Sequence, residues 1–345
     1  MKNFVLHTGS IMLMMLFLCS SCLKTTKPDT PPIIKVGLVG GLGGFNDAGF
    51  NQNILAGFQR AANDFPMFYQ SFDVKTSADF ASGINYFLSN DFNLIITSGY
   101  DAAQATLDAA NAHPGADFLI LDYSVASPPS NLLCAVFDVD QSSFPCGFLA
   151  AYWAYRSNLT NPVAGFVAGP DIPGIRQFSV SYTHGIAYFN TQYKKNVGVL
   201  GYNATSFSDT LQGAKLADSL IKQHAAVIFA FAGKTGNGAL YRAKEAGIRA
   251  IGVDVDQYLS IPKVGSILLT SCMKGLDVMV HDILGAYYNL NFQGGTVFHG
   301  NLGNGGVGLA PFHDYDQMIP DSIKTALVNI STGIKNGTIA TGWPE

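Results

Sequence analysis

Short apolar segments alternate with longer segments of mixed polarity along most of the chain. Residues 33–40 (IIKVGLVG) form a β-rich apolar run that ends in glycine. The next segment, residues 48–63, places Phe50, Ile54 and Phe58 at helical spacing, which predicts an amphipathic helix. The same succession recurs and predicts further strands at residues 72–75, 93–98, 117–123, 132–137, 162–169, 197–202, 226–231, 248–254 and 267–271. Intervening helices are expected at residues 102–111, 142–156, 172–190, 210–223, 238–246, 273–290 and 319–336.

These strand-like runs lack strict alternation, which is typical of parallel strands covered on both faces. Two successive series of strands and helices therefore predict an α/β fold with two doubly wound parallel-sheet lobes. The N-terminal lobe is expected to comprise residues 33–160 plus 270–296, and the C-terminal lobe residues 161–269 plus 297–345. Crossings near residues 160, 270 and 297 would form a hinge that opens and closes around a ligand.

The first thirty residues have the pattern of a targeting segment. Lys2 precedes the apolar run of residues 11–18, which is too short to span a bilayer, and Cys22 follows small residues. This pattern predicts a lipoprotein signal peptide at residues 1–21, a lipid on the thiol of Cys22 and an extended tether at residues 22–32. The protein would then be anchored in a membrane and face the periplasm or the exterior. An ordinary cleaved signal peptide with an incidental cysteine is the alternative.

Composition and charge exclude several other classes of protein. The chain has 345 residues, 13% of them charged, and a formal net charge of -4, which argues against a nucleic-acid-binding surface. The low charged fraction, together with 37 glycines, excludes a mainly disordered chain, and the length favours two lobes. Five cysteines are too few for a disulfide scaffold, although Cys134 and Cys146 could pair after export; buried free thiols are the alternative.

The glycine-rich turn after the first strand delivers polar residues to the end of a sheet. Asn46 stands where a dinucleotide fingerprint needs its third glycine, so that fingerprint fails. Ligands of doubly wound sheets sit beyond the carboxyl ends of strands, so Asn46, Asp47, Phe50 and Asn51 are candidates for ligand contact. Asp47 could instead cap the following helix, and the two roles can coexist.

Other strand ends carry the remaining candidates. Asp122 ends one strand, Asp254 and Asp256 share a face at the end of another, and Lys274 follows a third. Gly233-Lys234-Thr235 resembles the end of a phosphate loop, but the position that needs the earlier glycine holds Ile228. The histidines are scattered and there is no G-x-S-x-G, so neither a metal site nor a reaction is indicated.

Several long motifs in order resemble the family of bacterial basic membrane lipoproteins, whose best understood members bind purine nucleosides. The motifs include GFNDAGFNQNILAGF (residues 44–58), GFVAGPDIPGIRQF (165–178), VIFAFAGKTGNG (227–238), AIGVDVDQ (250–257), LLTSCMKGLDVMV (268–280) and GGVGLAPFHDYD (305–316). The resemblance covers about residues 33 to 320. It implies a type I periplasmic-binding-protein fold and a receptor for an ATP-driven (ABC) nucleoside importer, with a permease as partner and without cofactor or enzymatic activity.

The resemblance also implies roles for individual residues. Phe50 would stack on one face of the purine, and Phe229 would cover the other face, with Phe231 behind it. Asn46, Asp47 and Asp122 would contact the base, whereas Asp254 and Lys274 would bind the ribose hydroxyls. Asn51 and Gly233 complete the expected set. The sequence departs from the family pattern at Lys234, where glycine or serine is frequent, and at Cys272 and Met273.

Elementary chemistry agrees with a nucleoside ligand. A nucleoside presents a flat base and a diol, which aromatic rings and a carboxylate can hold. Because no phosphate cradle is recognised, we expect nucleosides to be preferred over nucleotides. A pentose or another small polar ligand is an alternative, as is a nucleoside hydrolase that uses Asp254 and Asp256. An additional role as a surface adhesin or antigen stays open.

Overall fold

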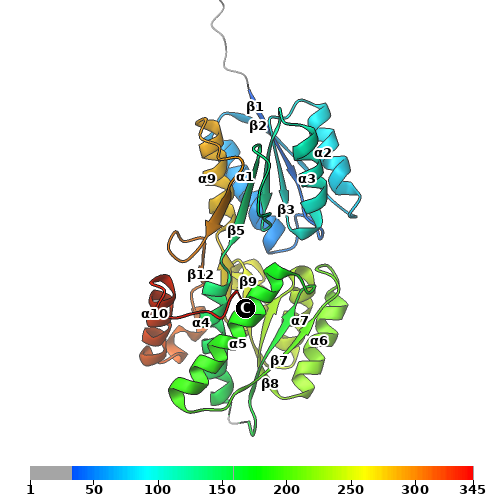
Figure 1. Ribbon diagram of the computed structural model, residues 1–345. Coiled ribbons are helices and arrows are strands. Elements are labelled where there is room, and N and C mark those ends of the chain that lie inside the picture. Colours follow the sequence, from blue (N-terminus) through cyan, green and yellow to red (C-terminus); the bar gives the residue numbers. More distant parts are fainter. Residues whose placement is uncertain (1–32, 158, 345) are drawn as a thin grey trace, which may run out of the picture. The chain divides into compact units, whose positions relative to one another are not determined.

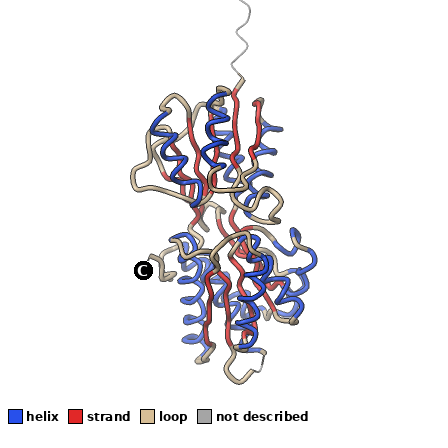
Figure 2. Tube along the Cα trace, turned by 90° about the vertical axis from the view of Figure 1, so that its right-hand side faces the viewer, coloured by secondary structure: helices blue, strands red, loops and turns tan. Residues whose placement is uncertain are grey.

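Two six-stranded sheets, each covered by helices on both faces, form the body of the protein in the computed structural model (Figures 1 and 2). The structure describes residues 33–157 and 159–344. The predicted signal peptide, the tether and Cys22 lie outside these residues. None of the described helices is long and apolar enough to cross a membrane.

The first sheet is parallel throughout, with the strand order β11-β5-β4-β3-β1-β2. Its strands are β1 (Ile34–Val39), β2 (Met67–Phe72), β3 (Leu94–Ser98), β4 (Asp117–Leu121), β5 (Leu132–Phe137) and β11 (Val297–Gly300). Helices α1 (Phe50–Asp64) and α9 (Leu276–Tyr288) pack together on one face, and α2 (Asp79–Ser89) and α3 (Ala103–Ala112) on the other. Every residue of β3 is buried, as expected for a strand with helices on both sides.

The second sheet has the order β12-β10-β9-β8-β6-β7, with only β12 antiparallel to its neighbour among the described strands. Its strands are β6 (Val163–Ala168), β7 (Gly198–Asn203), β8 (Ala225–Phe231), β9 (Arg249–Asp254), β10 (Leu268–Lys274) and β12 (Val307–Leu309). Helices α4 (Asp140–Arg156) and α5 (Pro173–Tyr193) cover one face, and α6 (Thr210–Lys222) and α7 (Gly233–Glu245) the other. The short helix α8 (Gln257–Ser260) follows β9, and α10 (Asp321–Lys335) packs on α4.

Helices α4 and α5 approach each other unusually closely. A Cβ atom at Gly147 would lie 2.0 Å from the carbonyl oxygen of Tyr182, and one at Gly185 would lie 2.0 Å from that of Phe144. Only glycine at both positions allows this contact between backbones. The close packing fixes α4 against the second sheet, although its residues directly follow the first.

The lobe boundaries differ from those expected from the sequence. Because α4 and β10 belong to the second sheet and β11 to the first, the chain crosses after Phe137, after Lys274 and after Gly300. The last two crossings lie close to the expected positions near residues 270 and 297, whereas the first comes well before the expected position near residue 160. The order of elements along the chain could not reveal this, since α4 is apolar on most sides and its partner helix follows later in the sequence.

The cysteines of the body are free. Cys134, Cys146 and Cys272 are all buried, and none is disulfide-bonded. The considered pairing of Cys134 with Cys146 is therefore not formed. Cys134 lies in β5 of the first sheet, whereas Cys146 lies in α4 on the second, so the two thiols belong to different layers of the fold.

Candidate functional site

A cavity of about 680 Å³ lies where strands of both sheets end. Parallel strands bring their carboxyl ends to one edge of a sheet, and here the two edges supply walls of the same cavity. The lining residues at or directly after strand ends include Ser98, Asp122, Phe137, Phe231, Asp254 and Lys274. The topology alone thus gathers carboxylates, an ammonium group and aromatic rings around one space.

Lys274 is the charged centre of the cavity. Its side chain is only 6% exposed, and its Nζ donates to Oδ2 of Asp122 at 2.7 Å and lies 3.6 Å from Oδ1 of Asp254. Asp122 follows β4 of the first sheet, whereas Asp254 and Lys274 end strands of the second. One buried ammonium group therefore joins the two sheets electrostatically.

The backbone at both carboxylates is in the left-handed region. Asp122 has a φ of 59° and Asp254 a φ of 65°, values that residues other than glycine adopt rarely. Such strained conformations cluster at binding sites, where the surrounding structure imposes them. At these two positions the turn out of the strand coincides with the ion pairs to Lys274.

Burial sets the charge states. Loss of solvation raises the pKa of Asp254 to about 6; Lys274 opposes the shift, and the nearby Asp122 and Asp47 add to it. Burial opposes the charge of Lys274 as well, but Asp122 and Asp254 outweigh it and raise the lysine pKa above its usual value. At neutral pH the site therefore holds a charged lysine and an ionised Asp254 that is readily protonated.

Aromatic rings surround the same ammonium group. Lys274 Nζ lies 5.3 Å from the ring centroid of Phe50, 5.3 Å from that of Phe178 and 5.8 Å from that of Phe137. Phe178 is stacked on Phe231 with centroids 5.2 Å apart. All four rings line the cavity, so flat apolar faces lie beside its charged groups.

The structure brings together most of the residues expected from the sequence. Those that line the cavity are Asp47, Phe50, Asn51, Asp122, Gly233, Asp254 and Lys274. Asn46 does not: it is exposed, and the neighbouring Asp47 is the residue that turns inward. Asp256 is also outside the cavity, where it pairs with His313 at 2.7 Å and caps α8.

Phe229 is a core residue, and the expected order of the two phenylalanines of β8 is reversed. Phe229 is 0% exposed and packs against Tyr182, Phe178 and Phe231, whereas Phe231 lines the cavity. Residues two apart in a strand share a face, so both rings point to the same side of the sheet. Only the ring at the carboxyl end reaches beyond the sheet edge.

Asp47 and Asn51 hold the glycine-rich turn in shape. The carboxylate of Asp47 accepts hydrogen bonds from the backbone nitrogens of Gly49 (3.0 Å), Asn51 (2.9 Å) and Gln52 (3.1 Å) and so caps α1. The side chain of Asn51 accepts from the nitrogen of Gly41 at 3.1 Å. The capping role considered for Asp47 is therefore present, and its place in the cavity wall adds to it.

The lobe built on the second sheet also forms hydrogen bonds with this turn. Asn237 of α7 donates from Nδ2 to the carbonyl oxygen of Asp47 at 2.9 Å, and Ser260 donates from Oγ to that of Ala48 at 2.7 Å. Gln257 in turn donates to Oδ1 of Asn237 at 3.2 Å. These contacts join backbone of the first lobe to side chains of the second beside the cavity.

Several lining residues were not expected from the sequence. They include Ser98, Tyr100, Asp101, Phe137, Phe178, Phe207 and Trp343. Ser98 and Phe137 end strands, so the strand-end rule that selected Asp122 would have found them. Phe178, Phe207 and Trp343 come from a helix, a loop and the C-terminal segment, which no local pattern connects to the cavity.

Comparisons with known proteins agree with this architecture. A family model described as "ABC transporter substrate-binding protein PnrA-like" matches residues 34–341. The chain is 28% identical over 318 residues to a protein of Lactococcus lactis subsp. cremoris named "ABC transporter nucleoside-binding protein BmpA", covering 87% of this chain and 88% of the relative. It is 27% identical over 285 residues to "Basic membrane protein B" of Borreliella burgdorferi, covering 79% and 80%.

Solved structures share the fold at low sequence identity. A solute-binding protein of an ABC transporter system from Aeropyrum pernix K1 superposes with a TM-score of 0.82 at 21% identity, covering 89% of this chain and 92% of that chain. A 5-methylthioribose transporter solute-binding protein from Thermotoga lettingae gives a TM-score of 0.57 at 13% identity, covering 90% and 94%. The two-lobed α/β fold with parallel sheets, of the type I periplasmic-binding-protein kind, is thereby confirmed.

Proposed function

The chain belongs to the family of PnrA-like ABC transporter substrate-binding proteins, and we propose on this basis that its cavity binds a purine nucleoside for delivery to a permease. The observation that carries the proposal is the pairing of Lys274 with Asp122 and Asp254 inside a wall of aromatic rings. A nucleoside needs both environments at once, because its base is flat and apolar on its faces and its ribose carries neighbouring hydroxyls.

Each part of the ligand has a matching group. Phe50 offers a ring to stack on the base, and a stacked aromatic face contributes roughly 1–3 kcal/mol. The second ring is supplied by Phe231 or by the stacked Phe178. The carboxylate of Asp254 accepts hydrogen bonds from the ribose hydroxyls, and the ammonium group of Lys274 donates to their oxygen atoms. Each hydrogen bond to a charged group contributes roughly 1.5–3 kcal/mol. Asn51 and Asp47 shape the wall at which Asp122 contacts the base.

The proposal predicts discrimination against phosphorylated ligands. The cavity wall holds more carboxylates than ammonium groups, so a phosphate would be repelled. In calorimetry with the purified protein, we expect adenosine, guanosine or inosine to bind at least tenfold more tightly than AMP, hypoxanthine or ribose. Tighter binding of AMP than of adenosine, or of ribose than of every nucleoside, would contradict the proposal. Ribose binding would favour the sugar alternative.

We propose binding without chemical change of the ligand. The hydrolase alternative needs Asp254 and Asp256 together, but Asp256 is held by His313 outside the cavity. Chromatography after overnight incubation with inosine distinguishes the two, because released hypoxanthine would favour the enzyme. Lipid attachment at Cys22, and with it a membrane-anchored position facing the periplasm or the exterior, is part of the same proposal.

Phe50 is expected to act on all purine nucleosides alike. Replacing Phe50 by alanine removes a stacking face and should lower the affinity for adenosine, for guanosine and for inosine by about tenfold each. The matched variant Phe50→Tyr keeps the ring and should bind nearly as the wild type does. Calorimetry measures both, and thermal unfolding without ligand checks that the variants fold. An effect confined to one nucleoside would mean that the ring does not stack on the base.

A further inference from the structure

The C-terminal segment, residues 337–344, forms part of the cavity wall. It leaves α10 after Lys335 and runs past α4 toward α5 (Figure 1). Trp343 and Pro344 are among the residues that line the cavity. None of the sequence motifs involves this segment, and the family match ends at residue 341. It therefore brings an aromatic ring to the site from outside the strand ends and helices that build the rest of it.

Both ends of the segment are fastened to the second lobe. The backbone nitrogens of Thr338 and Ile339 donate to the carbonyl oxygen of Gly333 at 2.8 and 3.1 Å. Gly342 has a φ of 86°, and a Cβ there would lie 2.5 Å from the imidazole of His184. Glycine is thus required at Gly342 for both its conformation and its space, because the backbone here lies directly against the His184 ring.

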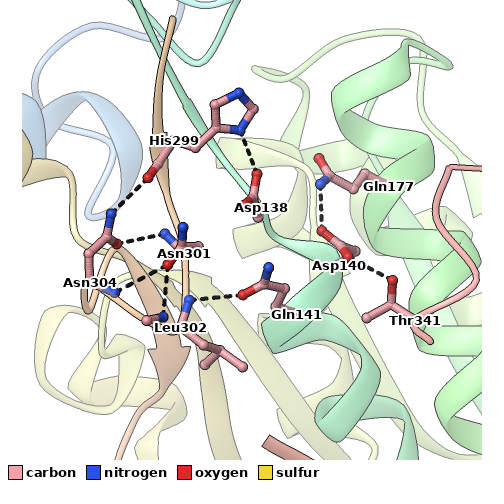
Figure 3. A network of polar contacts seen from close by, with 10 residues as sticks. Asp138, Asp140, Gln141, Gln177, His299, Asn301, Leu302, Asn304 and Thr341 are labelled. Atoms are coloured by element: carbon pink, nitrogen blue, oxygen red, sulfur yellow. Dashed lines mark hydrogen bonds and ion pairs between the residues drawn. The ribbon is translucent and has the colours of Figure 1, made fainter. Parts of the chain in front are cut away.

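Thr341 ties the segment to the cavity wall. Its Oγ1 donates to Oδ2 of Asp140 at 2.7 Å, while Nε2 of Gln177 donates to Oδ1 of the same carboxylate at 2.7 Å (Figure 3). Asp140 is 8% exposed, and each of its carboxylate oxygens already accepts a hydrogen bond. The nitrogen of Trp343 also donates to Oγ1 of Thr341 at 3.4 Å. Asp140 therefore serves as an anchor for the segment, and Trp343 follows directly from that anchor.

We infer that residues 337–344 are a strap that holds the Trp343 indole against the bound ligand. The inference rests on the proposed function and deepens it. An indole offers a wide flat apolar face, so Trp343 covers a planar or apolar part of a nucleoside and excludes water from it. Thr341 and Asp140 act through Trp343 as positioning residues. Because affinity differences between related complexes lie mostly in the dissociation rate, loss of the strap shortens the lifetime of the complex more than it slows association.

The test uses the full mature protein with inosine, in calorimetry and stopped-flow binding. Trp343→Ala should lower the affinity for inosine by about tenfold, mainly through faster dissociation. Thr341→Val should weaken it by a smaller factor although the indole is intact, and Thr341→Ser, which keeps the hydroxyl, should restore wild-type affinity. The double variant Thr341→Val with Trp343→Ala should bind inosine no worse than Trp343→Ala alone, because both substitutions remove the same contact between the indole and the ligand. The control Val328→Ala, at a 63% exposed position on α10, should bind as the wild type does.

Each outcome decides between the strap and the function. Wild-type binding with unchanged dissociation from Trp343→Ala would overturn the strap and leave the nucleoside proposal standing. Additive effects of the two substitutions, or no rescue by Thr341→Ser, would overturn the role of Thr341 as the tether of the indole. Failure of the wild type to bind inosine, adenosine and guanosine would overturn the proposed function and the strap together.

Discussion

Replacing Lys274 by methionine is expected to lower the free energy of unfolding by about 3 kcal/mol and to abolish nucleoside binding. Removing one partner of a buried ion pair costs about 3–5 kcal/mol because the remaining charge is left uncompensated. Here two carboxylates, those of Asp122 and Asp254, would lose the same ammonium group. The side chain of Asp122 is partly open to solvent, which places the expected loss at the lower end of that range.

The control for this prediction separates charge from packing. Methionine keeps the length and apolar stem of lysine, so the loss should arise from the unpaired carboxylates and not from a cavity. The double variant Lys274→Met with Asp254→Asn removes one of the stranded charges and should recover part of the stability. Lys263→Met, at an exposed lysine, should leave the unfolding midpoint unchanged. If urea unfolding at pH 7.5 gave Lys274→Met the same free energy of unfolding as the wild type, the ion pairs of Lys274 would contribute nothing to stability.

The strand ends were the part of the site that the sequence could predict. Asp122, Asp254 and Lys274 each follow an apolar run, and the carboxyl ends of parallel strands meet at one edge of a sheet. Asp254 and Lys274 converge because they end neighbouring strands of one sheet, and Asp122 joins them because the strand ends of the two sheets face the same cavity. The resemblance to a family then attached roles to these residues. The alternation of elements likewise sufficed to predict two parallel sheets, because it depends only on local pattern.

Features that depend on packing between distant segments could not be predicted. The assignment of α4 to the second sheet depends on its close contact with α5, made possible by Gly147 and Gly185. The choice between Phe229 and Phe231 depends on where β8 ends relative to the cavity edge, and boundaries of elements are the least certain part of a sequence prediction. Trp343 is placed at the cavity by the hydrogen bond from Thr341 to Asp140, a residue two hundred and one positions earlier in the chain.

Asp254→Asn is expected to reduce nucleoside affinity by about a hundredfold while leaving the unliganded protein as stable as the wild type or more so. A carboxylate that accepts from ribose hydroxyls contributes through charge-assisted hydrogen bonds, which an amide makes more weakly. In the absence of ligand the same charge is costly, since burial raises the pKa of Asp254 to about 6. A shift of that size corresponds to a penalty of about 3 kcal/mol at neutral pH. Loss of binding together with gain of stability would mark Asp254 as a ligand-binding residue.

The pH dependence of this difference provides the sharper measurement. The pKa of Asp254 is higher in the folded protein than its usual value of 3.8, so the folded state takes up a proton between about pH 4 and pH 6 that the unfolded state does not. Wild-type stability therefore falls as the pH rises through this window, whereas Asp254→Asn lacks that loss. Urea unfolding of both proteins from pH 4 to pH 8 should show equal stability near pH 4, a growing advantage of the variant up to about pH 6 and a constant advantage above it. A variant less stable than the wild type at pH 7.5 would show instead that the ionised carboxylate stabilises the fold through Lys274, and that its retention needs no ligand to explain it.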